Sequence, residues 1–147
     1  MAIVFSPYIQ EVIVENFIDE KKILNIIESK QKSFMQILQN FIREKYNLSF
    51  TEDIERQMIK IYKGAKISRQ RFSKIGKKEV PTKRTVIRLG FSLKLPKDKM
   101  LVLLKSSGYF LGINSKTDII LRWCLENEFY DIGKINVFLK KINAKEI

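Results

Sequence analysis

The sequence contains no histidine and only one cysteine among its 147 residues. Without an imidazole, the chain has no Ser-His-Asp triad, no Cys-His dyad and no histidine-bearing zinc or non-haem iron site. A single thiol forms neither a structural zinc cluster nor an internal disulfide. Chemistry that needs only carboxylates, Lys or Ser stays open. Because most common enzyme classes are excluded, we expect a protein that is not an enzyme and that holds no metal and no cofactor.

Long apolar runs are also missing. The first seven residues are mostly apolar, but they contain no Lys or Arg and end at Pro7, so we expect no export signal. The apolar runs elsewhere in the chain are short, for example residues 101–104, whereas a membrane span needs about 20 apolar residues. These features predict a soluble, cytoplasmic protein without a membrane segment, in which Cys124 is reduced.

Negative charge is scarce in one part of the chain. Residues 56–99 contain fifteen Lys or Arg against two acids, a net charge of +13, whereas the whole chain carries +12. The remaining residues therefore sum to −1. A generally Lys-rich composition explains the number of basic residues but not their concentration, because it would scatter them and match them with Glu. A segment this basic predicts a polyanionic partner.

Apolar residues recur at helical spacing through most of the chain, which predicts an all-α fold. Proline and glycine are few, at three and six residues, which agrees with this fold class. The clearest helix covers residues 33–46, where Ser33 and Gln36 have the spacing of a capping box. Later helices are predicted to begin at Thr51, Ser68, Thr82, Pro96, Asn114 or Ser115, and Asp131.

The first 32 residues are predicted to be an N-terminal extension. Ser6 and Pro7 suit the start of a helix, and the apolar residues of 9–17 and 24–27 indicate two short helices. Residues 2–5 alternatively form a strand. The apolar side chains of this extension suit self-association.

Residues 58–75 have the layout of a helix-turn-helix. A first helix ends near Gly64, a short turn follows, and a short second helix begins at the N-cap candidate Ser68 and turns Phe72 and Ile75 inward. With this motif, residues 33–108 resemble the lambda-repressor-like, Cro/C1-type helix-turn-helix proteins, which implies a core of five helices.

The sequence departs from that family pattern at two positions. The family usually has Ala where Tyr62 stands and Gly where Lys66 stands. Because Gly64 lies two residues before Lys66, either the turn has another shape or Lys66 adopts a left-handed conformation at some cost.

The C-terminal side is similar to small bacterial Cro/C1-type proteins with two further helices. The similarity rests on Ser107-Gly108-Tyr109 after the fifth helix and on Tyr130-Asp131. The full expectation is an all-α fold with a lambda-repressor-like five-helix core. Its parts are the extension at residues 1–32, the helix-turn-helix domain at residues 33–112 and the C-terminal pair, packed on the core, at residues 113–147.

Outward residues of the short second helix are predicted to contact base edges, since Arg suits guanine and Gln suits adenine. These residues are Arg69, Gln70, Ser73 and Lys74. The flanking polar and basic residues are predicted to contact phosphates, which needs little more than positive charge within reach. They are Lys66, Ser68, Arg71, Lys77, Lys78, Lys83 and Arg84. The alternative for both groups is an ordinary solvated surface.

Three other features have two interpretations. Large apolar residues near the C-terminus form either a dimer face or, as is commoner at helical spacing, part of the core; they are Trp123, Phe129, Tyr130 and Phe138. Cys124 is predicted to be a small buried apolar residue. The acids Glu52, Asp53 and Glu55 are potential Mg²⁺ ligands, but a position in the first turn of a helix explains them without a metal.

Together these features predict a sequence-specific protein that binds double-stranded DNA as a homodimer. It would be a transcriptional regulator of phage or mobile-element type that acts by occupying an operator. The alternative is a non-enzymatic inhibitor or adaptor that uses the basic face to bind RNA or a nucleic-acid enzyme. A weaker alternative is a non-catalytic subunit of an enzyme.

Overall fold

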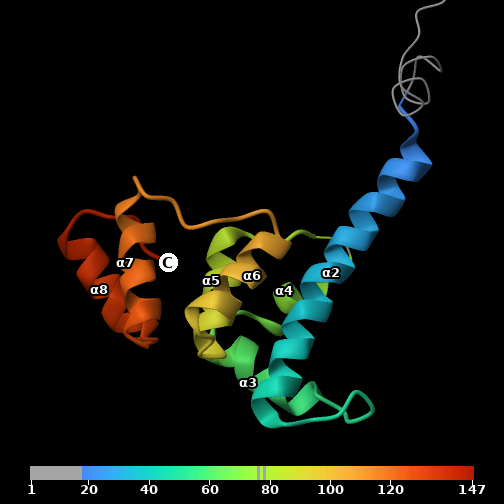
Figure 1. Cartoon of the computed structure of the whole chain (residues 1–147), viewed down its shortest axis with the longest axis horizontal. Helices are drawn as coiled ribbons and strands as arrows, with labels where there is room; N and C mark the ends of the chain where they lie inside the picture. Colours follow the sequence, from blue (N-terminus) through green and yellow to red (C-terminus); the bar gives the residue numbers. More distant parts are fainter. Residues whose placement is uncertain (1–17, 76, 78) are drawn as a thin grey trace, which may run out of the picture.

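The computed structural model describes residues 18–75, 77 and 79–147, and within them it contains seven α-helices and one isolated bridge between Ile75 and Glu79. The all-α fold class is therefore confirmed. The elements expected within residues 1–17 lie outside the described residues. The helices, drawn in Figure 1, are α2 (Glu20–Tyr46), α3 (Glu55–Gly64), α4 (Arg69–Lys74), α5 (Lys83–Ser92), α6 (Lys97–Ser106), α7 (Lys116–Glu126) and α8 (Ile132–Lys141).

Helix α2 is longer than the sequence pattern predicted. It begins at Glu20, where the Asp19 carboxylate accepts a hydrogen bond from the backbone amide of Lys22, and it runs unbroken for 27 residues. The predicted start at Ser33 and the separate short helix around residues 24–27 are therefore wrong. No proline or glycine interrupts residues 20–46, so nothing ends the helix before the capping-box pattern at Ser33. The first turns of α2 extend beyond the other helices (Figure 1).

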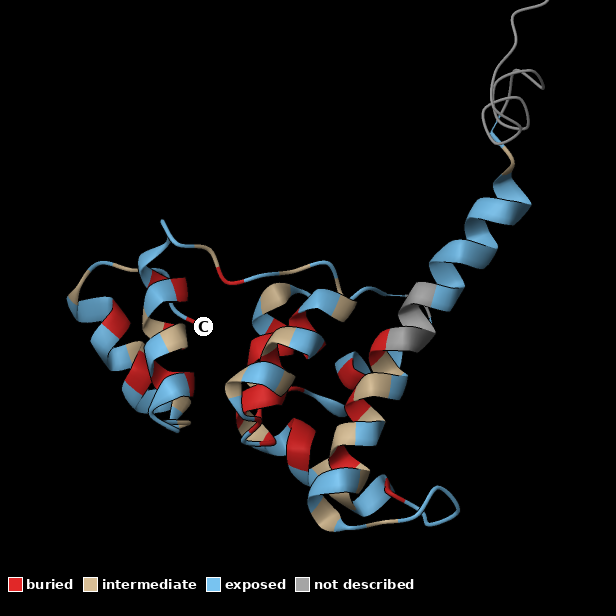
Figure 2. Ribbon diagram, in the orientation of Figure 1, coloured by how far each residue is buried: buried red, intermediate tan, exposed pale blue. Residues whose placement is uncertain are grey.

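The main core lies among α2, α3, α5 and α6, where α6 packs against both α2 and α5, and α3 packs against α5 and α2. From α2, Phe34, Leu38 and Ile42 are fully buried, at the spacing that was predicted for its apolar face. Leu89 of α5 and Leu103 of α6 are equally inaccessible. Figure 2 shows these buried residues as the red faces turned toward the centre of the helical group. Each such side chain contributes roughly 1.5–3 kcal/mol by leaving water.

Helix α3 begins later than predicted. It starts at Glu55, and the N-cap position is occupied by Ile54 without a side-chain hydrogen bond. Thr51 lies in a turn instead, because the Arg43 guanidinium donates to the carbonyl oxygens of Ser49 and Glu52 at 2.7 Å each and holds that turn closed. The Thr51 start is therefore wrong. The predicted caps at Ser68, Thr82, Ser115 and Asp131 are confirmed, since each of these side chains accepts a backbone N–H bond.

Helices α7 and α8 form a pair in which α7 packs against α6, and individual side chains contact α5 and the turn after it. The ring of Tyr130, which precedes α8, meets the edge of Phe91 with centroids 5.6 Å apart, and its hydroxyl donates to the Leu95 carbonyl. Trp123, Phe129 and Phe138 are exposed, so the interpretation of these three as core residues is wrong, whereas Tyr130 is partly buried against the core. The buried residues of α7 include Leu121, Cys124 and Leu125. None of the helices in the described residues combines the length and the apolar composition needed to cross a bilayer.

Candidate nucleic-acid interface

The turn between α3 and α4 depends on Lys66. This residue has φ +56°, so of the two alternatives for the turn the left-handed one is observed. The amide of Lys66 donates to the Lys63 carbonyl and the amide of Ile67 donates to the Tyr62 carbonyl, a bond pattern that closes α3 and redirects the chain. Gly64 serves another purpose: a Cβ there would lie 2.5 Å from the Ser92 hydroxyl of α5, so only glycine permits this close approach.

Helix α4 is fixed by its inner side. The ring of Phe72 stacks on Tyr62 of α3 with centroids 5.0 Å apart, and both side chains are buried. The tyrosine that departs from the family pattern is thus the contact that sets the position of α4. Ile67 before the helix and Ile75 after it are also buried.

The four residues predicted to contact bases are therefore all on the outside. Arg69, Gln70, Ser73 and Lys74 are exposed. The Ser73 hydroxyl donates to the Gln70 carbonyl within the helix, which leaves the longer three side chains as the groups that reach outward. The Ser68 hydroxyl, predicted to contact phosphate, accepts from the Arg71 amide and caps α4.

Three guanidinium groups gather beside α4. Arg71 comes from α4, and Arg84 and Arg88 lie one turn apart on α5. Burial first, and then the positive charges of Arg84 and Arg71, lower the pKa of Arg88. Its Nη2 donates to the Ile147 carbonyl at 3.1 Å, while its buried Nε has no hydrogen-bond partner among the described residues. Like charges that interact with one another in this way favour an anion that would neutralise them.

Arg88 was not singled out from the sequence. Its spacing of four residues from Arg84 was a usable signal, because residues at i and i+4 share one face of a helix.

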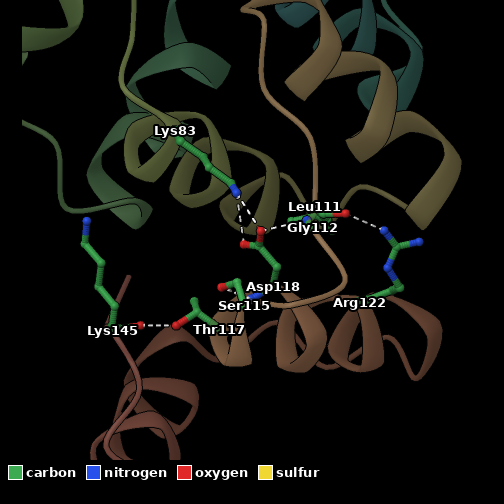
Figure 3. Close-up of polar contacts among 8 residues, drawn as sticks. All are labelled: Lys83, Leu111, Gly112, Ser115, Thr117, Asp118, Arg122 and Lys145. Atoms are coloured by element: carbon green, nitrogen blue, oxygen red, sulfur yellow. Dashed lines mark hydrogen bonds and ion pairs between the residues drawn. The ribbon is translucent and has the colours of Figure 1, made fainter.

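Lys83 has a different position from the one expected of a phosphate contact. Figure 3 shows its ammonium turned toward Asp118 of α7, whose two carboxylate oxygens lie 3.0 and 2.8 Å from Nζ. The same carboxylate accepts from the Gly112 amide at 2.7 Å, and Asp118 is buried. Lys83 therefore joins α5 to α7 and the segment that precedes it. Asp118 was not identified from the sequence, because its partner lies 35 residues away.

The remaining predicted residues are available to a partner. Lys66, Arg71, Lys77 and Arg84 are exposed, and Lys78 lies outside the described residues. Lys83, Lys97 and Lys99 form ion pairs in the described part of the chain, whereas Lys66, Arg71, Lys77, Arg84 and the base-contact candidates form none there. None of these basic groups around α4 is therefore held in an ion pair within residues 18–75, 77 and 79–147.

No group of three or more Cys, Asp or Glu in the described residues is arranged to hold a metal ion, and this includes Glu52, Asp53 and Glu55.

Comparison of the chain with protein-family models, with curated proteins and with solved structures gives no match. We therefore base the proposed function on the arrangement of α3, α4 and α5.

Proposed function

We propose that the chain is a sequence-specific double-stranded DNA-binding protein with a lambda-repressor-like helix-turn-helix core. In this proposal α2 to α6 are the five core helices, α3 and α4 are the motif, and α4 enters the major groove. The observation that carries it is the outward row of Arg69, Gln70 and Lys74 on a helix fixed by its buried side, next to the exposed Arg71 and Arg84, which form no ion pair among the described residues.

Reading of bases would come from the exposed first turn of α4. The guanidinium of Arg69 suits guanine O6 and N7, and the amide of Gln70 suits adenine N6 and N7. The stacked Tyr62–Phe72 pair supports this role, because a side chain reads a base only when its helix has one defined position.

Phosphate binding would come from residues on both sides of α4. Lys66 and Lys77 flank the helix, and Arg71, Arg84 and Arg88 form the cluster beside it. Lys83 leaves this set because its ammonium is held by Asp118. Arg88 is half-buried and its Nη2 is bonded to the Ile147 oxygen, so it adds positive charge behind the exposed residues. These contacts would place the protein on the duplex without reading its sequence.

In this proposal the protein is a cytoplasmic transcriptional regulator of phage or mobile-element type that acts by occupying an operator. No chemistry on the DNA is required. A single motif reads only a few base pairs, so we expect a homodimer on half-sites about 34 Å apart.

Selection from a random duplex library tests the proposal. One enriched motif is expected, and binding to it should weaken with salt at a slope of about −5 to −7 in log affinity against log salt, if about five to eight phosphates are contacted. A slope near zero would remove nucleic acid as the partner. Salt-dependent binding without an enriched motif, and stronger on RNA than on duplex, would instead favour the RNA- or protein-binding adaptor.

A further inference from the structure

A groove with apolar walls lies between α7 and α8. It has a volume of about 480 Å³, and its lining is apolar except for Lys134. Three aromatic side chains form its walls and remain accessible to water: Trp123 is 55% exposed, Phe138 46% and Phe129 36%. Helices that belong to one folded core do not normally leave their largest apolar residues on the outside.

The exposed apolar area extends beyond the groove. Ile119 on α7 and Val137 on α8 are 49% and 64% exposed. Because a fully accessible aromatic side chain presents about 150–250 Å², these five residues together expose on the order of 400–500 Å². A standard interface buries about 800 Å² per partner, of which somewhat more than half is apolar. The exposed apolar area therefore matches one side of a stable dimer.

The charge of this part of the chain indicates which partner fits. Residues 113–147 contain six Lys or Arg and five acids, a net charge of +1, whereas residues 56–99 carry +13. A polyanion has little to bind here, and a strongly charged peptide would find few counter-charges. A second copy of the chain brings an equally apolar, nearly neutral surface.

The helical pair has the geometry that such an association needs. Helices α7 and α8 are joined by the five residues 127–131, the length that connects antiparallel neighbours in bundles. Two such pairs placed groove to groove across a twofold axis make a four-helix arrangement, in which each residue meets the same surface of the other copy.

We propose that two copies of the chain associate through the α7–α8 groove, with Trp123, Val137 and Phe138 of each copy packed against the other. This inference concerns assembly and does not require DNA binding. It is tested without DNA, so its failure is distinguishable from failure of the proposed function.

The first measurement needs no substitution. Trp123 is the only tryptophan of the chain, so its fluorescence reports this surface alone. As the protein concentration increases, we expect the sedimenting mass to rise from 17.4 kDa to twice that value. The tryptophan emission should shift to shorter wavelength over the same concentrations, because the indole leaves water.

Three variants, each replacing an exposed apolar residue by Glu, locate the interface. Val137→Glu places a charge in the proposed contact, and Val102→Glu is the matched control on α6, where Val102 is 50% exposed. Leu24→Glu tests the exposed start of α2, where Leu24 is 62% exposed. Circular dichroism verifies that all three are folded. Because two buried like charges oppose each other, Val137→Glu should raise the dimer Kd by about 100-fold or more, and the other two should leave it nearly unchanged.

Several results would overturn the proposal. A wild-type chain that remains a monomer at the highest soluble concentration would do so. A dimer whose formation leaves the Trp123 emission unchanged would also contradict it. A dimer that survives Val137→Glu, or that Leu24→Glu disrupts instead, would place the interface elsewhere.

Discussion

Replacement of Lys66 by glycine is expected to stabilise the protein and weaken its binding to DNA at the same time. Lys66 has φ +56° in the turn before α4. A left-handed conformation costs a non-glycine residue about 1–2 kcal/mol, and glycine gives back about 0.5–1 kcal/mol through its greater freedom in the unfolded chain. From the middle of both ranges, the net gain is about 0.75 kcal/mol, which for a chain of this size raises Tm by about 1.5–3 °C.

Lys94 provides a matched control. It also has φ +56°, and it follows α5 as Lys66 follows α3. Lys94→Gly should therefore raise Tm by a similar amount. Lys94 lies ten residues beyond Arg84, or about 15 Å along a helical path, so it is at the other end of α5 from the exposed Arg84. We expect Lys94→Gly to leave DNA affinity nearly unchanged.

Thermal denaturation followed by circular dichroism and binding of a labelled duplex followed by anisotropy test both halves. Lys66→Gly should reduce the salt slope by about one unit. Lys66→Ala should do the same without raising Tm, because alanine retains the unfavourable φ. If Lys66→Gly lowers Tm, the turn is not under the strain described. If Lys66→Gly and Lys94→Gly change DNA affinity equally, Lys66 has no special position beside the interface.

Three other predictions concern stability and are measured by urea unfolding. Gly64→Ala should lower the free energy of unfolding by about 1–3 kcal/mol, because its methyl group would meet the Ser92 hydroxyl, which donates to the Ile61 carbonyl at 2.7 Å. Adding Ser92→Ala should recover most of that loss. If the losses of the two substitutions simply add, the close approach is contradicted. Asp118→Asn should cost roughly 2–3 kcal/mol, since it removes the charge that pairs with Lys83 from a buried position. Glu126→Gln, at the exposed pair with Lys97, should have almost no effect, and equal losses would refute the distinction. Burial raises the pKa of the Cys124 thiol. As pH rises, this thiol therefore ionises first in the unfolded chain, at about pH 8.5, and only at higher pH in the folded chain. The free energy of unfolding should therefore be insensitive to this group at lower pH and fall as pH rises toward the raised pKa; Cys124→Ala should make the fall shallower, and an unchanged fall would show that the thiol does not contribute.

Local signals were the ones that sequence analysis could use. The caps of α4, α5, α7 and α8 were predictable because each depends on a side chain and an amide three residues later. The left-handed Lys66 was one of two stated alternatives, since a turn that lacks glycine at that position has few conformations available.

The errors come from contacts between distant residues or from competing local signals. Thr51 has a good N-cap sequence, but Arg43, from the preceding helix, closes the chain into a turn at that point. Ser33 resembles a helix start because of its own neighbours, although nothing upstream ends the helix that already passes through it.

The candidate site was predicted in outline but not in its partners. The exposed residues of α4 follow from the inward spacing of Phe72 and Ile75. The Lys83–Asp118 pair and the approach of Arg71 to Arg88 depend on how α7 and α4 pack against α5, which no local pattern specifies. The exposure of Trp123 was one of two stated interpretations, because α7 carries apolar residues on more than one face, and only packing decides which face is buried.

The most direct test of the account is the ratio of affinities for a selected duplex and a shuffled duplex, measured for the wild type, Arg69→Ala and Arg84→Ala. Arg69→Ala is expected to lower affinity for the selected duplex by an amount that corresponds to about 1–3 kcal/mol and to leave the shuffled duplex nearly unaffected, so the ratio falls. Arg84→Ala should weaken both duplexes alike, so the ratio stays constant. If Arg69→Ala also weakens both duplexes equally, α4 does not read bases and the central claim is wrong.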